Sequence, residues 1–200
     1  YITVVNRDSA GAVAVPSGAT VNGNAATPVS AGLVNTGNVV AVRTFYYPHP
    51  PSGTVDVAAT GGAGSDFILM AVRSYSGVDT ADPINTPKNS PAAAATAELY
   101  VNTLASDAGQ LCVLGGGARK GTANITYAPE GTAPVSTEKV DITHTSGSPQ
   151  ISLAVYEEAG AQTSIDMRVT QSESAQNAAI AVCLKPAAAA TPQQTPVFYP

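Results

Sequence analysis

The chain has 200 residues, of which 44% are hydrophobic and only 12% charged, and its formal net charge is −5 at pH 7. This apolar composition excludes a disordered chain, and the negative charge argues against nucleic acid or an anionic membrane as a partner. Every apolar stretch is short and is interrupted by Gly, Pro or polar residues, so no membrane-spanning segment is predicted.

Short strands separated by turns are predicted for the first part of the chain, at residues 1–5, 12–15, 39–47 and 54–59. Residues 20–33 are small and polar and are predicted to be a long loop. The strand at residues 39–47 ends at Pro48-His49-Pro50-Pro51, because proline cannot donate to a sheet ladder.

The longest apolar run of the chain is Phe67–Val72, which is followed by the turn residues Gly77 and Asp79. It is too short to span a membrane, and its large and β-branched residues favour a strand buried on both faces. We therefore expect this strand at the centre of the fold, with Leu69 and Val72 in the core.

The second half of the chain continues the pattern, with strands predicted at residues 97–105, 110–114, 122–127, 138–144, 150–156, 164–170 and 178–184. The glycine-rich residues 115–121 are predicted to be a loop between strands, and residues 157–162 and 172–176 to be turns. Ala92 to Ala95 are too few and too uniform to predict a helix.

This pattern predicts one all-β domain, an antiparallel β-sandwich of jelly-roll-like form with extended N- and C-terminal segments. Residues 1–38 contribute strands and a loop to the sandwich, and residues 39–186 form its core. Residues 187–200 form an extended proline-rich arm. No internal repeat or mid-chain linker divides the chain.

The two cysteines, Cys112 and Cys183, each lie inside a predicted strand. One interpretation is that they are two separate, small buried side chains. The other is a disulfide between neighbouring strands. A metal pair is disfavoured, because no His or further Cys lies at ligand spacing.

No catalytic residue and no cofactor is predicted, and the chain is not expected to be an enzyme. The segment from Gly115 to Thr122 has Lys120 before Gly121, whereas a phosphate-binding loop needs Gly-Lys-Ser/Thr before a helix. Glu157 and Glu158 are adjacent, so on a strand they point to opposite faces, and we expect solvated charges rather than a catalytic pair.

No metal site is predicted, and Asp79, Asp82 and Asn85 are the only weak candidates. Their oxygen atoms are suitable ligands for calcium, but EF-hand spacing and a following bidentate Glu are missing. We expect these residues to serve turn chemistry instead.

Two aromatic segments are candidates for contacts with other molecules. Tyr46 and Tyr47 are the best candidates for a ligand contact, because β-sandwiches bind sugars on aromatic surfaces, although a packed strand end is the alternative. Val197, Phe198 and Tyr199 form an apolar group on the proline-rich arm. We expect them to anchor the arm on a neighbouring subunit of a homo-oligomer, with folding back onto the same domain as the alternative.

Three segments together resemble a loosely defined group of β-sandwich domains. They are Phe67 to Pro83 with its Ser-Gly-Val-Asp-x-x-x-Pro ending, the strand at residues 110–114, and the closing Ala179-Ile180-Ala181-Val182-Cys183-Leu184-Lys185-Pro186. Such domains occur in bacteriophage structural proteins and in bacterial secreted proteins. The group often has a Trp before the Gly-Val-Asp strand, and this chain has no Trp.

The resemblance implies a scaffold or attachment module rather than an activity. We therefore expect a structural protein on a virion surface, a phage capsid decoration or fibre component whose partners are other virion proteins or copies of itself. The alternative is a secreted carbohydrate-binding or adhesion module, for which the partner is a glycan.

Overall fold

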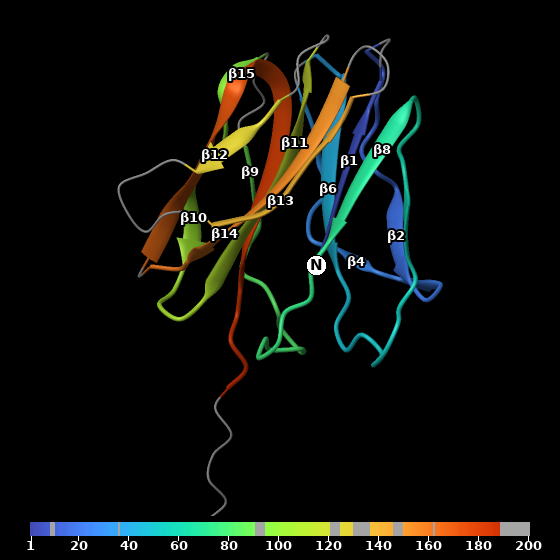
Figure 1. The fold of residues 1–200 in the computed structure, drawn as a ribbon. Helices are drawn as coiled ribbons and strands as arrows, with labels where there is room; N and C mark the ends of the chain where they lie inside the picture. The colour runs from blue at the N-terminus through green and yellow to red at the C-terminus, as the bar shows by residue number, and fades with distance from the viewer. Residues whose placement is uncertain are drawn as a thin grey trace, which may run out of the picture.

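The computed structural model describes residues 1–8, 11–35, 37–90, 95–120, 125–129, 137–145, 150–161 and 163–188. Every regular element within these ranges is a β-strand, and the strands pair antiparallel, which confirms the predicted antiparallel β-sandwich (Figure 1). No helix in the described ranges is long and apolar enough to cross a membrane.

One sheet is built around the N-terminal strand, and we call it the β1 sheet. In it β1 (Ile2–Arg7) lies between β6 (Val40–Tyr46) and β8 (Phe67–Val72). The short strands β4 (Thr27–Pro28) and β5 (Leu33–Val34) also pair with β6. Residues from the start of the chain therefore form the middle of this sheet.

A small sheet covers one face of the β1 sheet. It has β2 (Gly18–Val21) between β3 (Asn24–Ala25) and β7 (Val57–Thr60). Val21 and Phe45 belong to the core cluster between these two sheets. The predicted loop at residues 20–33 therefore contains short strands, which are too brief to leave a periodic pattern in the sequence.

The third sheet holds the long strands, in the order β10 (Thr96–Ser106), β15 (Thr163–Leu184), β11 (Leu111–Lys120), β14 (Gln150–Ala159) and β13 (Thr137–His144). Two short strands, β9 (Lys88–Asn89) and β12 (Tyr127–Pro129), also pair with β15. β15 changes layer along its length, because residues 163–175 pair with β10 and residues 176–184 pair with β11. The sheet thus forms an outer layer around β10 and a central layer around β11 and β14 (Figure 1).

The central layer is buried on both faces. Toward the outer layer, Tyr156 packs in one cluster with Met167 of β15. Toward the β1 sheet, Val155 packs in a second cluster with Val5. The described side chains of β14 are therefore buried on both faces along most of the strand.

The central layer contacts the β1 sheet most closely at the glycines of residues 115–117 in β11. A Cβ atom on Gly115 would overlap the Thr3 side chain, and one on Gly117 would lie 2.7 Å from Cγ1 of Val5. The prediction of a loop here is wrong, because these glycines continue the strand and leave room for β1 to pack directly on it.

The run Phe67–Val72 forms β8, but the prediction that it is the buried central strand is wrong. Among the described strands β8 pairs only with β1 and lies at the end of its sheet. Phe67, Ile68 and Val72 are 37%, 41% and 45% exposed, and Leu69 is only partly buried against the core. β11 and the second half of β15 instead carry many small residues, because other layers pack on both of their faces.

Other predicted boundaries also differ from the structure. Residues 12–15 form no strand, and the predicted strand at 122–127 begins only at Tyr127, with residues 121–124 outside the described part. The predicted turn at residues 172–176 lies inside β15. Polar residues occur there because the strand passes from the outer layer to the central layer.

A disulfide joins Cys112 of β11 to Cys183 of β15, and both residues are fully buried. The two cysteines face each other directly in the register of these strands. Of the two interpretations left by the sequence, the structure therefore has the cross-strand disulfide. The bond links the two strands that meet at the centre of the fold.

Replacing Gly117 with alanine should lower the free energy of unfolding by about 1–3 kcal/mol, because overpacking of a tight core forces side chains and backbone to shift. The new Cβ would overlap the carbonyl oxygen of Ser152 and press on Val5. Denaturant unfolding measures the effect. Gly18→Ala is the matched control, since nothing lies within 4 Å of a Cβ at Gly18, and equal stability of the two variants would contradict the close packing.

Removing the disulfide with the double substitution Cys112→Ala and Cys183→Ala should cost about 2–4 kcal/mol of stability, because the bond closes a long loop. The two cysteines are 71 residues apart in sequence. Reductant should destabilise the wild-type chain and leave the double variant unchanged. Two reactive thiols in the unfolded, unreduced wild-type protein would disprove the bond.

Candidate functional site

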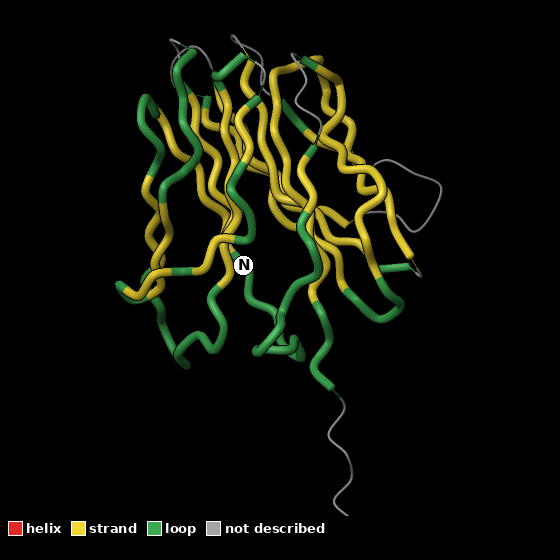
Figure 2. The backbone as a smooth tube through the Cα atoms, turned by 180° about the vertical axis from the view of Figure 1, so that it is seen from behind, coloured by secondary structure: helices red, strands yellow, loops and turns green. Residues whose placement is uncertain are grey.

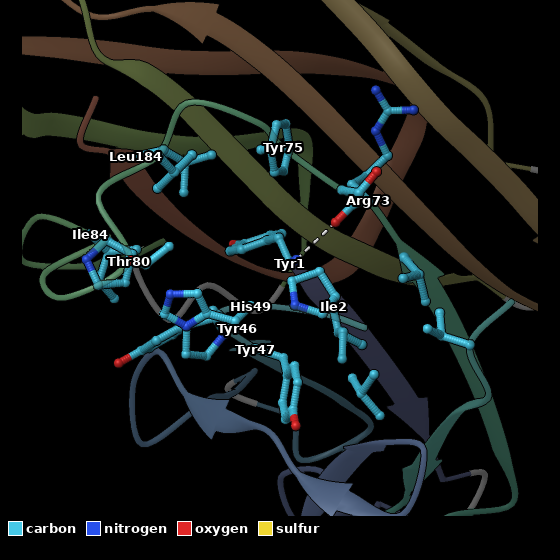
Figure 3. Close-up of a pocket in the computed structure, with 18 of the residues that line it drawn as sticks. Tyr1, Ile2, Tyr46, Tyr47, His49, Arg73, Tyr75, Thr80, Ile84 and Leu184 are labelled. Atoms are coloured by element: carbon cyan, nitrogen blue, oxygen red, sulfur yellow. Dashed lines mark hydrogen bonds between the residues drawn. The ribbon is translucent and has the colours of Figure 1, made fainter. Parts of the chain in front are cut away.

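A cavity of about 270 Å³ opens at one end of the sandwich, and we call it the basal cavity. It lies where the β1 sheet, the small sheet and the end of β15 meet (Figure 3). The loops that follow β6 and β8 form its wall, and Figure 2 shows these loops at the lower end of the molecule. Segments far apart in sequence thus form one pocket.

Four tyrosines and one histidine line the basal cavity. Tyr46 and Tyr47, the predicted ligand contacts, both line it, together with Tyr1, Tyr75 and His49 (Figure 3). Adjacent residues on a strand point to opposite faces, but β6 ends at Tyr46 and the chain then bends. His49 sits in this bend with a φ of 54°, so the bend brings both tyrosines to the same space.

The rest of the lining is mostly aliphatic or proline: Ile2, Val21, Pro48, Pro50, Val55, Val57, Val72, Val78, Pro83, Ile84 and Leu184. Ser74, Asp79 and Thr80 add polar atoms at the wall. Arg73 also lines the cavity, but its guanidinium points away from Tyr46, Tyr47 and His49 (Figure 3). The cavity therefore favours an apolar or aromatic group over an ionic one.

A buried charge network stands beside the basal cavity. Glu157, predicted to be a solvated charge, is only 8% exposed. Its Oε1 accepts hydrogen bonds from the Tyr75 hydroxyl (2.7 Å) and the Arg73 guanidinium (3.4 Å), and its Oε2 lies 3.3 Å from Nζ of Lys139. A buried carboxylate needs such partners. The network thus fixes Tyr75 at the cavity wall.

The pKa of Tyr75 is raised by burial first and by its hydrogen bond to Glu157 second. Burial also raises the pKa of the Tyr127 and Tyr156 phenols. The Tyr156 hydroxyl donates to Oε2 of Glu138 (3.0 Å), and a nearby carboxylate favours the neutral phenol. All three phenols are therefore held in the neutral form in the folded chain.

Asp79, Asp82 and Asn85 serve local structure. Asp79 accepts the backbone N–H two residues on (2.9 Å), Asp82 pairs with Lys185, and the Asn85 amide donates to the side chain of Gln110 (2.8 Å). Within the described ranges, no group of three or more His, Cys, Asp and Glu side chains is placed to hold a metal ion. The structure thus places these three residues in separate contacts.

The loop after β8 lies against the end of β15. The Ala187 N–H donates to the Gly77 carbonyl (2.7 Å), and the Asp79 N–H donates to the Lys185 carbonyl (2.9 Å). Gly77 has a φ of +71°, which residues with a side chain rarely adopt. Two of the segments that carried the sequence resemblance, Ser-Gly-Val-Asp and Leu184-Lys185-Pro186, are therefore neighbours in space.

The predicted interface residues Val197, Phe198 and Tyr199 lie outside the described residues, as does the whole arm from residue 189 onward. The structure shows where the arm is attached to the domain. Pro186 pairs with Val78, which lines the basal cavity, so the described chain ends at the cavity wall.

The sequence did not indicate Tyr1 or Tyr75 as site residues. Tyr1 lies just before β1 and Tyr75 in the loop after β8, and no local spacing relates them to each other or to Tyr46. Burial raises the pKa of the Tyr1 phenol, as expected for a side chain inserted between sheets.

Comparison of the chain with protein-family models, with curated proteins and with solved structures finds no match in any of the three. The geometry of the basal cavity and of the exposed strands is therefore what points to a function.

Raised phenol pKa values predict how stability depends on alkaline pH. Tyr1, Tyr75, Tyr127 and Tyr156 have folded pKa values above the ordinary value of about 10. Below pH 10 the folded and unfolded chains bind these protons equally, and above it only the unfolded chain releases them. The contribution of these phenols to the free energy of unfolding should therefore be constant below about pH 10 and decrease as the pH rises above it.

Phenolate absorbance measures this directly. In the native protein four of the eight tyrosines should ionise only when the chain unfolds, whereas all should ionise together near pH 10 in denaturant. Tyr75→Phe should remove one of the late-ionising groups. Complete, reversible ionisation near pH 10 with the fold retained would show that these phenols are not buried.

Proposed function

We propose that the chain is a non-enzymatic structural protein of a virion surface, a decoration or fibre component that acts through contacts between subunits. The observation that supports it best is an apolar surface on two neighbouring sheet edges. Among the described residues, the large exposed hydrophobic side chains are Phe67, Ile68, Val72 and Ile142. Three of them belong to β8 and the fourth to β13.

We call β8 and β13, with these four side chains, the β8–β13 edge; side chains alternate along β8, so Ile68 and Val72 share one face and Phe67 lies on the other. The Phe67 ring lies 4.6 Å from the His144 ring of β13, measured between centroids. Ile142 is two residues before His144, so it lies on the same face of β13. β8 and β13 each end their sheet among the described strands.

An exposed sheet edge of this kind is suited to pairing with another chain. Edge strands of monomers are usually protected by charges, proline or bulges, because their free N–H and C=O groups invite a further strand. Phe67–Val72 contains no charge and no proline, and it is six residues long. Contacts between subunits through this strand would bury its apolar side chains and satisfy its backbone.

Further features support a location outside a reducing compartment. A buried disulfide such as Cys112–Cys183 persists in oxidising surroundings, including virion surfaces and secreted proteins. The low charge content and the resemblance of the Ser-Gly-Val-Asp and closing segments to phage structural domains point the same way.

A second candidate function is a secreted carbohydrate-binding module, and the basal cavity favours it. Four tyrosines, Tyr1, Tyr46, Tyr47 and Tyr75, line the cavity, and aromatic rings can stack on sugars. A glycan array combined with particle purification separates the two functions. Selective glycan binding without particle association would reverse their order.

The test of the structural proposal is a charge placed on the β8–β13 edge. Ile68→Lys should weaken self-association through this edge at least about tenfold, because a lysine in a pairing edge strand must lose its hydration when the edge is covered. Light scattering over a range of concentrations measures this. Ala58→Lys is the matched control, since Ala58 is an exposed residue of β7 at another sheet edge.

Two results would contradict the proposal. One is a wild-type chain that stays monomeric at high concentration, and the other is an Ile68→Lys variant that keeps the wild-type mass while remaining folded. Circular dichroism of both variants establishes that the fold is retained.

A further inference from the structure

The basal cavity has the size of a site for one or two side chains. Its volume is about 270 Å³, at the lower limit of the roughly 300–1,000 Å³ of pockets that enclose a whole small ligand. It combines four tyrosines with Pro48, Pro50 and Pro83. Grooves lined by aromatic residues are the usual receptors of extended proline-rich segments, because such segments lose little entropy on docking.

A segment with this chemistry belongs to the chain itself. Residues 191–200 read Thr-Pro-Gln-Gln-Thr-Pro-Val-Phe-Tyr-Pro, with three prolines and the apolar group Val197, Phe198 and Tyr199. The segment has no charged side chain. It is therefore complementary to a cavity whose Arg73 guanidinium is turned away toward Glu157.

The chain enters this segment from the wall of the cavity. Ala187 donates to Gly77, and Pro186 pairs with Val78, and both partners line the cavity. Residues 187–200 contain no Gly, Asn or Asp, the residues that most readily reverse a chain. At about 3.1 Å per residue, the stretch from residue 188 to residue 197 can extend roughly 30 Å away from its own cavity.

From these observations we infer that the basal cavity binds residues 192–200 of a second copy of this chain. Phe198 and Tyr199 enter among Tyr46, Tyr47 and Tyr1, and the prolines lie against the aromatic rim. This inference rests on the proposed function, because it supplies a second contact between subunits, at a cavity that shares only Val72 with the β8–β13 edge. A contact of this kind joins two different surfaces, so it builds rings or open chains of subunits.

A synthetic peptide of residues 191–200, added to the chain shortened before Thr191, tests the site. The peptide should bind saturably, and Thr80→Trp should weaken binding at least about tenfold, because Thr80 is an exposed residue of the cavity wall and an indole there fills the space. Ser76→Trp is the matched control on the same loop, exposed and outside the lining. A peptide with Phe198 and Tyr199 replaced by Ser should not bind.

Absence of peptide binding, or equal binding to the Thr80→Trp and Ser76→Trp variants, overturns the inference. Either result leaves the assembly measured with Ile68→Lys unaffected, so failure here is distinguishable from failure of the proposed function.

A mixing experiment tests whether the occupant is a second copy, with both proteins carrying Ile68→Lys to remove the other contact. One protein has Thr80→Trp and the complete arm, and the other has the open cavity and ends before Thr191. Neither should self-associate, and the mixture should form a one-to-one complex. If the full-length Ile68→Lys chain is instead monomeric and binds the peptide at least about tenfold more weakly than the shortened chain, its own arm fills the cavity and the inference is wrong.

Discussion

The packing of β1 directly on the glycines of β11 is the constraint on which the rest of the structure depends. A glycine inside a strand costs roughly 0.5–1 kcal/mol relative to alanine. Here that cost is offset because Gly115 and Gly117 let Thr3 and Val5 approach the strand backbone. Without this approach the β1 sheet could not close over the central layer, and Val155 and Ile180 would lose their cover.

Burial of the central layer on both faces explains where the large apolar residues are found. β11 and the end of β15 use small side chains between the layers, as at Ala178, Ala179 and Ala181, whereas β14 carries larger ones such as Leu153 and Tyr156. Large residues move outward to the clusters between layers or to the edge strand β8. The apolar β8–β13 edge is thus a consequence of the layering, and it gives the module a surface that another chain can cover.

The basal cavity follows from the same layering. The β1 sheet, the small sheet and the end of β15 converge at one end without filling the space between them, and four tyrosines from three segments of the chain line this space. The Glu157 network holds Tyr75 at the wall, and the turn at Gly77 ties the wall to the point where the proline-rich arm leaves. One end of the sandwich therefore combines a tyrosine-lined cavity with the point where the proline-rich arm is attached.

The sequence by itself determined the all-β class, the antiparallel strands, the proline-terminated strand β6 and the aromatic pair Tyr46 and Tyr47, because strand periodicity and turn residues are local signals. Only the tertiary structure decided that Gly115–Gly117 lie in a strand, that β8 is an edge, and that Glu157 is buried. A glycine-rich run has the same sequence pattern in a loop as in a strand, and an apolar run has the same pattern in an edge strand as in a central one. Their burial depends on which layer packs against them, and that is set by contacts between residues far apart in the chain.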